Sequence, residues 1–143
     1  MKRYLFCCAL ACLTACTNKP QEKRSADEIE GARVLADARK ELQAKRYDAA
    51  RDSIVSLRQN HPLAFDARKQ GILLLDSIEL LAARDSFDAL NVRAQQQYMA
   101  SLDNPDAPLQ LDSATYVDEH ERLDMKVQFF ERKLKEDWKS QHP

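Results

Sequence analysis

Glycine is nearly absent from this chain of 143 residues, which contains only Gly31 and Gly71. Alanine, leucine, glutamate, arginine and lysine are abundant instead, and these residues have the highest helix propensities. The composition therefore predicts an all-α fold. It also leaves no glycine-rich loop of the kind that holds nucleotide phosphates, because such loops need several glycines at close spacing.

Capping and proline signals mark where the first two helices should begin and end. Ser25 and Glu28 have the spacing of a capping box, so the first helix is expected from about Ala26 to Ala44. The second helix is expected from about Asp48 to Gln59, with Pro62 just beyond its end. The expected apolar faces are Ile29, Ala32, Leu35, Ala38 and Leu42 in the first helix, and Ala50, Ile54 and Leu57 in the second.

A longer pair of helices is expected over residues 63–139. The third helix should run from Leu63 to about Leu102, where the breaker cluster 103–108 ends it. The fourth helix should begin at Asp112 or Ser113 and extend for about 26 residues, enough to lie antiparallel to the distal part of the third. The predicted architecture is a short helical hairpin over 26–62, followed by a long antiparallel coiled-coil-like hairpin.

Apolar residues at four-three spacing define the contact faces of this long pair. The stripe of the third helix is displaced after Leu81, and we interpret the offset as a stutter or a slight bend. The predicted positions are Ala67, Gly71, Leu74, Ile78 and Leu81, then Ala83, Phe87, Leu90 and Ala94, and in the fourth helix Tyr116, His120, Leu123, Val127, Phe130 and Leu134, with Trp138 just beyond.

The first 15 residues have the layout of a signal peptide. Lys2 and Arg3 precede an apolar run from Tyr4 to Leu13, which at about ten residues is too short for a membrane-spanning helix. The sequence Leu13-Thr14-Ala15-Cys16 follows, and it resembles the lipobox of bacterial lipoproteins. The resemblance implies that residues 1–15 are removed and that Cys16 is acylated, palmitate included. The alternative is an ordinary cleaved signal peptide with an incidental Cys16.

Lipidation would place the chain in the bacterial cell envelope. Several acyl chains hold a domain at a membrane where one chain binds only marginally. Thr17 is not the acidic residue that commonly retains lipoproteins at the inner membrane, so the resemblance suggests the outer membrane, facing the periplasm. Residues 16–25 are expected to form a flexible tether. Cys7, Cys8 and Cys12 would be discarded with the signal peptide, which leaves no disulfide framework and no thiolate metal site.

Residues 31–64 resemble one tetratricopeptide repeat. Tyr47 stands where that family has an aromatic residue before its second helix, and Pro62 where it has a helix-ending proline; Ala38, Ala50, Ile54 and Leu57 stand at its packing positions. Val34 and Lys45 depart from the pattern, since the family has an aromatic residue and a turn glycine there. No second copy follows, so a solenoid is not predicted. A chance helical hairpin of the same shape is the alternative.

A second resemblance concerns the fourth helix. The stretch Arg122-Leu123-Asp124-Met125-Lys126-Val127-Gln128-Phe129-Phe130-Glu131 is similar to segments of uncharacterised lipoproteins from Bacteroidetes-type bacteria. This family implies a location and no chemistry.

Catalytic signals are sparse. His120 and Asp124 are one helical turn apart, a spacing that can hold a metal, but no second ligand pair accompanies them, so we read His120 as a residue of the helical contact face. Asp76, Asp85 and Asp88 are interpreted as surface charges. The sequence has no nucleophile elbow, zinc-protease or phosphate-loop motif. We therefore expect no enzyme activity, no cofactor and no metal site.

The expected function is protein binding. Met125, Phe129 and Trp138 are candidate contact residues, either for a partner or for the short hairpin, and Tyr98 is a candidate either for a partner or for weak packing that extends the long hairpin. The chain carries 22 Lys and Arg against 23 Asp and Glu, and loss of Lys2 and Arg3 would leave a well-mixed net charge of about −3, which argues against nucleic acid. The alternatives are a structural spacer or self-associating coiled coil and, less favoured, a metal-dependent hydrolase. The oligomeric state is left open.

Overall fold

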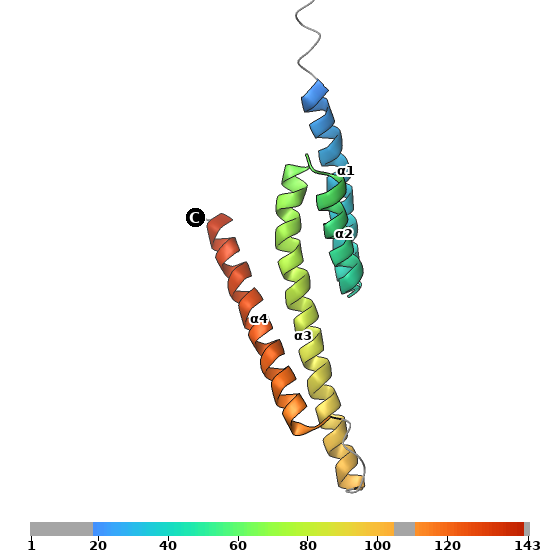
Figure 1. Ribbon diagram of the computed structural model, residues 1–143, viewed down its shortest axis with the longest axis vertical. Helices are drawn as coiled ribbons and strands as arrows, with labels where there is room; N and C mark the ends of the chain where they lie inside the picture. The colour runs from blue at the N-terminus through green and yellow to red at the C-terminus, as the bar shows by residue number, and fades with distance from the viewer. Residues whose placement is uncertain (1–18, 105–110, 142–143) are drawn as a thin grey trace, which may run out of the picture.

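The computed structural model describes residues 19–104 and 111–141, and helix accounts for nearly all of them. The helices are α1 (Lys19–Gln43), α2 (Tyr47–Asn60), α3 (Phe65–Asp103) and α4 (Ser113–Gln141) (Figure 1). No strand occurs in these two ranges, so the predicted all-α fold is confirmed. With 39 residues, α3 is about 58 Å long at 1.5 Å per residue.

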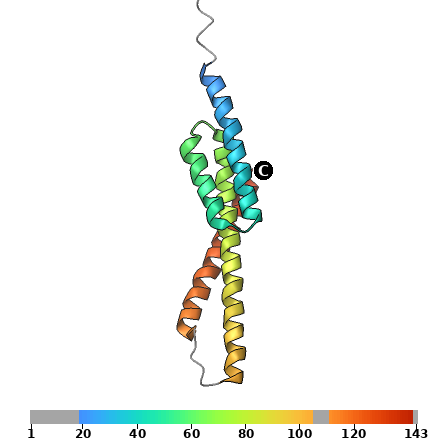
Figure 2. The same ribbon diagram turned by 90° about the vertical axis from the view of Figure 1, so that its right-hand side faces the viewer.

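The helices form an elongated assembly in which α3 is shared by two halves (Figures 1 and 2). α1 and α2 pack against each other and against the N-terminal half of α3. α3 then continues past them, and α4 runs back along it in the opposite direction. Within the described residues, the backbone of α4 packs on α3 and not on α1 or α2.

The main core lies between α1, α2 and the first half of α3, with Leu57 at its centre. A Cβ atom built on Gly31 would lie 3.2 Å from one methyl of Leu57, and one built on Gly71 would lie 3.1 Å from the other. The two glycines therefore let α1 and α3 approach this leucine closely from both sides. The other buried apolar residues of this core are Leu35, Ala38, Ala50, Ile54, Ala64, Ala67 and Ile78.

The turn between α1 and α2 is formed without glycine. Lys45 has a φ of 57°, the left-handed conformation that commonly ends a helix, and its N–H donates to the Leu42 carbonyl at 2.9 Å. The Lys45 ammonium and the Tyr47 hydroxyl both bind the Asp85 carboxylate on α3, at 2.9 and 2.6 Å. Burial, together with this hydrogen bond, raises the pKa of Tyr47 to about 12. These contacts fasten the turn to α3.

The start of α1 differs from the prediction. α1 begins at Lys19 and not at Ala26, so residues 19–25 are helical and Ser25 lies inside the helix. The expectation of a flexible tether is therefore wrong for residues 19–25, while 16–18 lie outside the described residues. The stretch has no helix breaker after Pro20, and a proline is tolerated in the first turn of a helix.

The two acidic residues after Ser25 bind the start of α3 instead of capping α1. Oδ2 of Asp27 accepts the Leu63 N–H at 2.6 Å, and Oε1 of Glu28 accepts the Ala67 N–H at 2.7 Å. Backbone N–H groups at a helix start have no partner within the helix, and α3 has no side-chain cap of its own. Carboxylates from α1 therefore complete the hydrogen bonding of the α2–α3 connection.

The buried face of α1 agrees with the prediction at Leu35 and Ala38 but differs from it nearer the start of the helix. Ile29 is 67 % exposed and Ala32 is also exposed, whereas Gly31 is buried. A Cβ atom at Gly31 would lie only 2.5 Å from the Cβ of Ala64, so this glycine marks the closest approach of α1 to the α2–α3 connection. Counting apolar residues misses such a contact, because the residue that makes it has no side chain.

α3 uses different faces for its two partners, which corrects the predicted stutter. Ile78 belongs to the core with α1 and α2, whereas Leu90 belongs to a second cluster with α4. The two residues are twelve positions apart, so they lie about 120° apart around the helix. Leu81 was expected to continue the first stripe and is 38 % exposed. The displaced stripe therefore reflects a change of packing partner.

Candidate functional site

The distal end of the α3–α4 pair has a small core of its own. Leu90 of α3, Leu111 before α4 and Leu123 of α4 are buried together there. Phe87, Ala94 and Tyr116 pack on this cluster, and the Tyr116 hydroxyl donates to Oδ1 of Asn91 at 3.0 Å. The predicted contact positions Leu90 and Leu123 are thus buried, and the distal end of the pair is a packed structure.

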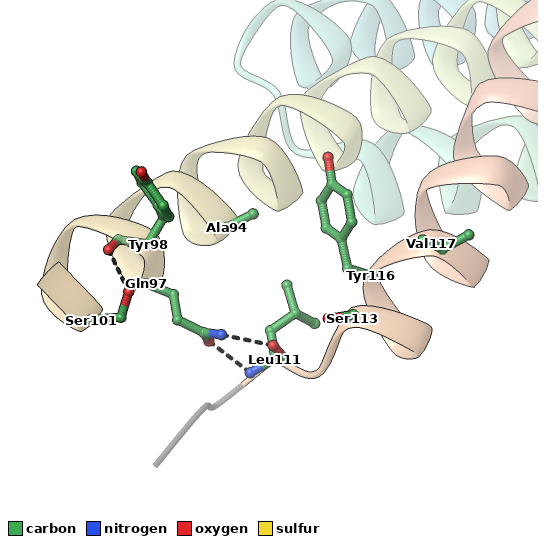
Figure 3. Close-up of a pocket in the computed structure, with 8 residues that line it drawn as sticks. All are labelled: Ala94, Gln97, Tyr98, Ser101, Leu111, Ser113, Tyr116 and Val117. Carbon is green, nitrogen blue, oxygen red and sulfur yellow. Dashed lines mark hydrogen bonds between the residues drawn. The ribbon is translucent and has the colours of Figure 1, made fainter. Parts of the chain in front are cut away.

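A glutamine fixes the point where the chain enters α4 (Figure 3). The Gln97 side-chain amide donates to the Leu111 carbonyl at 2.7 Å and accepts the Leu111 N–H, also at 2.7 Å. Asp112 then caps α4 by accepting the Thr115 N–H at 2.9 Å. Hydrogen bonds from Thr115 hold the pKa of Asp112 below its ordinary value.

These contacts frame a cavity of about 290 Å³ between the end of α3 and the start of α4. In Figure 3 the Tyr98 ring rises from α3 and the Tyr116 ring from α4, with the Leu111 side chain between the two helices. No lining residue carries a charge at neutral pH. We call this cavity the tip pocket; it is lined by Ala94, Gln97, Tyr98, Ser101, Leu111, Ser113, Tyr116 and Val117.

His120 packs between two aromatic rings of the α3–α4 contact, with its ring tilted relative to both. Its ring centroid lies 4.6 Å from that of Phe87 and 5.5 Å from that of Tyr116. Asp124, which lies one helical turn from His120 at a spacing that can hold a metal, accepts a hydrogen bond from Gln128 at 2.7 Å. Among the described residues, no three His, Cys, Asp or Glu side chains are grouped so that they could hold a metal ion.

The four candidate contact residues do not share one surface. Tyr98 is 64 % exposed and lines the tip pocket. Met125 and Phe129 are exposed one helical turn apart on α4, so they face the same way. Trp138 is also exposed, but it follows Phe129 by nine positions, or about two and a half turns, which places it on the opposite side of α4. Phe129 makes an edge-to-face contact with Phe130, with ring centroids 5.0 Å apart.

Charged side chains hold the other half of α4 to α3. Lys133 binds Asp76 at 2.7 Å, and Asp76 is 4 % exposed, so the reading of Asp76 as a surface charge is wrong. Glu79 of α3 binds Arg51 of α2 and also Lys126 of α4, the latter at 2.8 Å. The Arg51 guanidinium, together with Lys126, holds the pKa of Glu79 below its ordinary value, against the opposing effect of burial. Glu79 thus joins three helices.

Stability should depend on pH through Glu79. Because its pKa is lower in the folded than in the unfolded chain, its contribution is present above the unfolded pKa and is lost as the pH falls through the folded pKa. Glu79→Gln should therefore destabilise the protein by about 2 kcal/mol at pH 7 and by much less at pH 3. Urea unfolding at both pH values measures this. The control is Glu131→Gln, whose half-exposed pair with Arg84 should contribute less than about 1 kcal/mol; equal losses from both variants would contradict the assignment.

The tip pocket was missed in the sequence, although one signal pointed to it. Gln97 follows the buried Leu90 and the partly buried Ala94 at four-three spacing, so its polar side chain falls on the face that packs on α4 and needs a hydrogen-bond partner there. The partner, the backbone of Leu111, lies beyond the breaker cluster. Only the fold shows that the two segments meet.

No protein-family model matches this chain, and comparison with curated proteins and with solved structures finds no match either. In the part of the chain that the structure describes, no helix is both long and apolar enough to cross a membrane. Cys16 and the lipobox-like residues lie outside the described ranges.

Proposed function

We propose that this protein is a lipid-anchored component of the bacterial cell envelope, that it acts without catalysis, and that it binds another envelope protein as an adaptor or assembly factor. The observation that carries the proposal is the distal end of the α3–α4 pair, where an uncharged cavity of about 290 Å³ lies beside the exposed Tyr98 ring. Uncharged, concave surfaces with an exposed aromatic residue are typical of sites that anchor a partner side chain.

The arrangement of the helices is suited to binding a partner at a distance from a lipid anchor. The first described residues of α1 lie at one end of the molecule and the end of α3 lies at the other (Figure 1). A lipid on Cys16 would hold the α1 end near the outer membrane, and the tip pocket would project away from it. The exposed side chains of Met125 and Phe129 offer a second apolar contact along α4.

Site-specific photo-crosslinking in the living host tests this proposal. A photoreactive amino acid placed at Tyr98 or at Phe129 should join the protein to a specific envelope protein. Asp52, an exposed polar position on α2, is the matched control and should give no such product. The absence of a protein product at both test positions, in cells that express the variants normally, would exclude the adaptor function.

A self-associating spacer is the second candidate, because α3 has an exposed apolar stripe. Leu81, Val92 and Met99 are exposed, and steps of 11 and 7 residues return them to nearly the same face. Light scattering on the purified protein distinguishes the two functions. A monomer over a wide concentration range agrees with the adaptor, whereas a dimer that Val92→Glu dissociates would support the spacer.

A further inference from the structure

We infer that the tip pocket receives an apolar side chain from a positively charged segment of the partner protein. This inference rests on the proposed function and specifies the chemistry of the partner. Two independent features carry it: the polar groups that line the pocket, and the charges that surround it.

Three of the five polar side chains that line the pocket are hydrogen-bonded within the protein, whereas the hydroxyls of Tyr98 and Ser113 have no hydrogen bond to the described residues. The Gln97 amide donates one hydrogen bond to the Leu111 backbone and accepts one from it, and the Tyr116 hydroxyl donates to Asn91. The Ser101 hydroxyl donates to the Tyr98 carbonyl at 2.7 Å. Away from those two hydroxyls, a polar occupant would leave its own groups without partners, which costs free energy on desolvation, whereas an apolar side chain loses no hydrogen bond. The occupant is therefore apolar.

The surroundings of the pocket are acidic. Between Arg93 and Arg122 the chain has no lysine or arginine, although Arg93 itself is adjacent to Ala94, which lines the pocket. Over the same stretch, the described acidic residues each lie within four positions of a residue that lines the pocket. Four of them are exposed and make no ion pair with the described residues, while Glu119 pairs with Arg122 at 3.5 Å. These acidic residues are Asp103, Asp112, Asp118, Glu119 and Glu121.

This charge distribution indicates that the partner segment that carries the apolar side chain is basic. Carboxylates around a binding site attract a cationic partner, speed its association and repel acidic ones. Two copies of this chain joined tip to tip would bring the same carboxylates together, so a symmetric dimer through the pocket is disfavoured. An anionic lipid surface would be repelled for the same reason. A protein segment with an apolar residue flanked by lysine or arginine satisfies both the pocket and its surroundings.

The test is photo-crosslinking from Val117 of the full chain in the living host, with identification of the crosslinked peptide. We expect a partner peptide that has an excess of lysine and arginine around an apolar residue. Reversal of two charges with Asp118→Lys and Glu121→Lys should reduce the crosslink roughly tenfold, since each exposed charge contributes a factor of a few. The matched control, Asp52→Lys with Glu136→Lys, reverses two exposed carboxylates outside the stretch from Arg93 to Arg122 and should leave the yield unchanged.

Several outcomes would overturn the inference. They are a neutral or acidic partner peptide, a product with lipid or with a second copy of this chain, or a yield that charge reversal does not change. All substituted residues are exposed, and equal thermal unfolding midpoints would show that the fold is intact. If Phe129 gives a protein product and Val117 gives none, the inference fails while the adaptor function stands. If Tyr98, Phe129 and Val117 all give no product, both fail.

Discussion

Replacing Lys133 with methionine should lower the free energy of unfolding by about 3 kcal/mol, because the change leaves the buried Asp76 carboxylate without its cation. Asp76 is 4 % exposed, and the Lys133 ammonium donates to its Oδ1 at 2.7 Å. Its Oδ2 is buried and has no hydrogen-bond partner among the described residues. The carboxylate thus depends on one lysine. Urea denaturation followed by circular dichroism measures the loss.

A double variant distinguishes the loss of the whole ion pair from the loss of the lysine alone. Asp76→Leu combined with Lys133→Met removes both charges, and it should recover most of the stability, because replacing a buried ion pair with apolar residues is often neutral or stabilising. Lys135→Met is the control, since Lys135 is exposed on α4 and makes no ion pair with the described residues; its effect should stay within about 0.5 kcal/mol. A double variant as unstable as Lys133→Met would contradict the explanation.

The second large effect is expected from Leu57→Ala, which should destabilise the protein by about 3 to 4 kcal/mol. Leu57 is fully buried where α1, α2 and α3 meet, and its two methyl groups lie next to Gly31 and Gly71. Removing the side chain leaves a cavity among three helices that cannot all move inward together. Thermal or urea unfolding of the purified protein measures the change.

The two glycines provide a matched rescue and control for that cavity. In the Leu57→Ala background, Gly71→Ala should restore about 1 kcal/mol or more, because the added methyl occupies vacated space and alanine is the better helix former. Gly31→Ala should not rescue, since its added Cβ would still lie 2.5 Å from the Cβ of Ala64. Equal behaviour of the two glycine substitutions would show that the packing around Leu57 is described wrongly.

The two halves of the α3–α4 contact are held by different chemistry. Near the tip, Leu90, Leu111 and Leu123 form an apolar cluster, and Gln97 fixes the entry of the chain into α4. Towards the end of α4, the pairs Asp76–Lys133, Glu79–Lys126 and Arg84–Glu131 connect the helices. The α3–α4 contact therefore has an apolar cluster near the tip pocket and charged pairs towards the end of α4.

Much of the fold could be predicted because its signals are local. The helix of residues 65–103, the break after it and the start of the last helix follow from apolar spacing, proline and an Asp112 cap, all of which act within a few residues. The start of α1 could not be predicted in the same way. The carboxylates that resemble a local cap bind Leu63 and Ala67 instead, far away in sequence.

The candidate site was only partly predictable for the same physical reason. Tyr98 was identified as a contact residue, and it lines the tip pocket. The pocket itself, the Gln97 clamp and the burial of Asp76 depend on which segments meet across the α3–α4 contact. The sequence by itself determined that this protein is helical and where its long helices break, because helix formation is decided by neighbours three and four residues apart. Only the tertiary structure decided which face of α3 packs on α1 and α2 and which packs on α4. That choice depends on the close approach at Gly31 and on ion pairs between residues far apart in the sequence, which the spacing of apolar residues does not reveal.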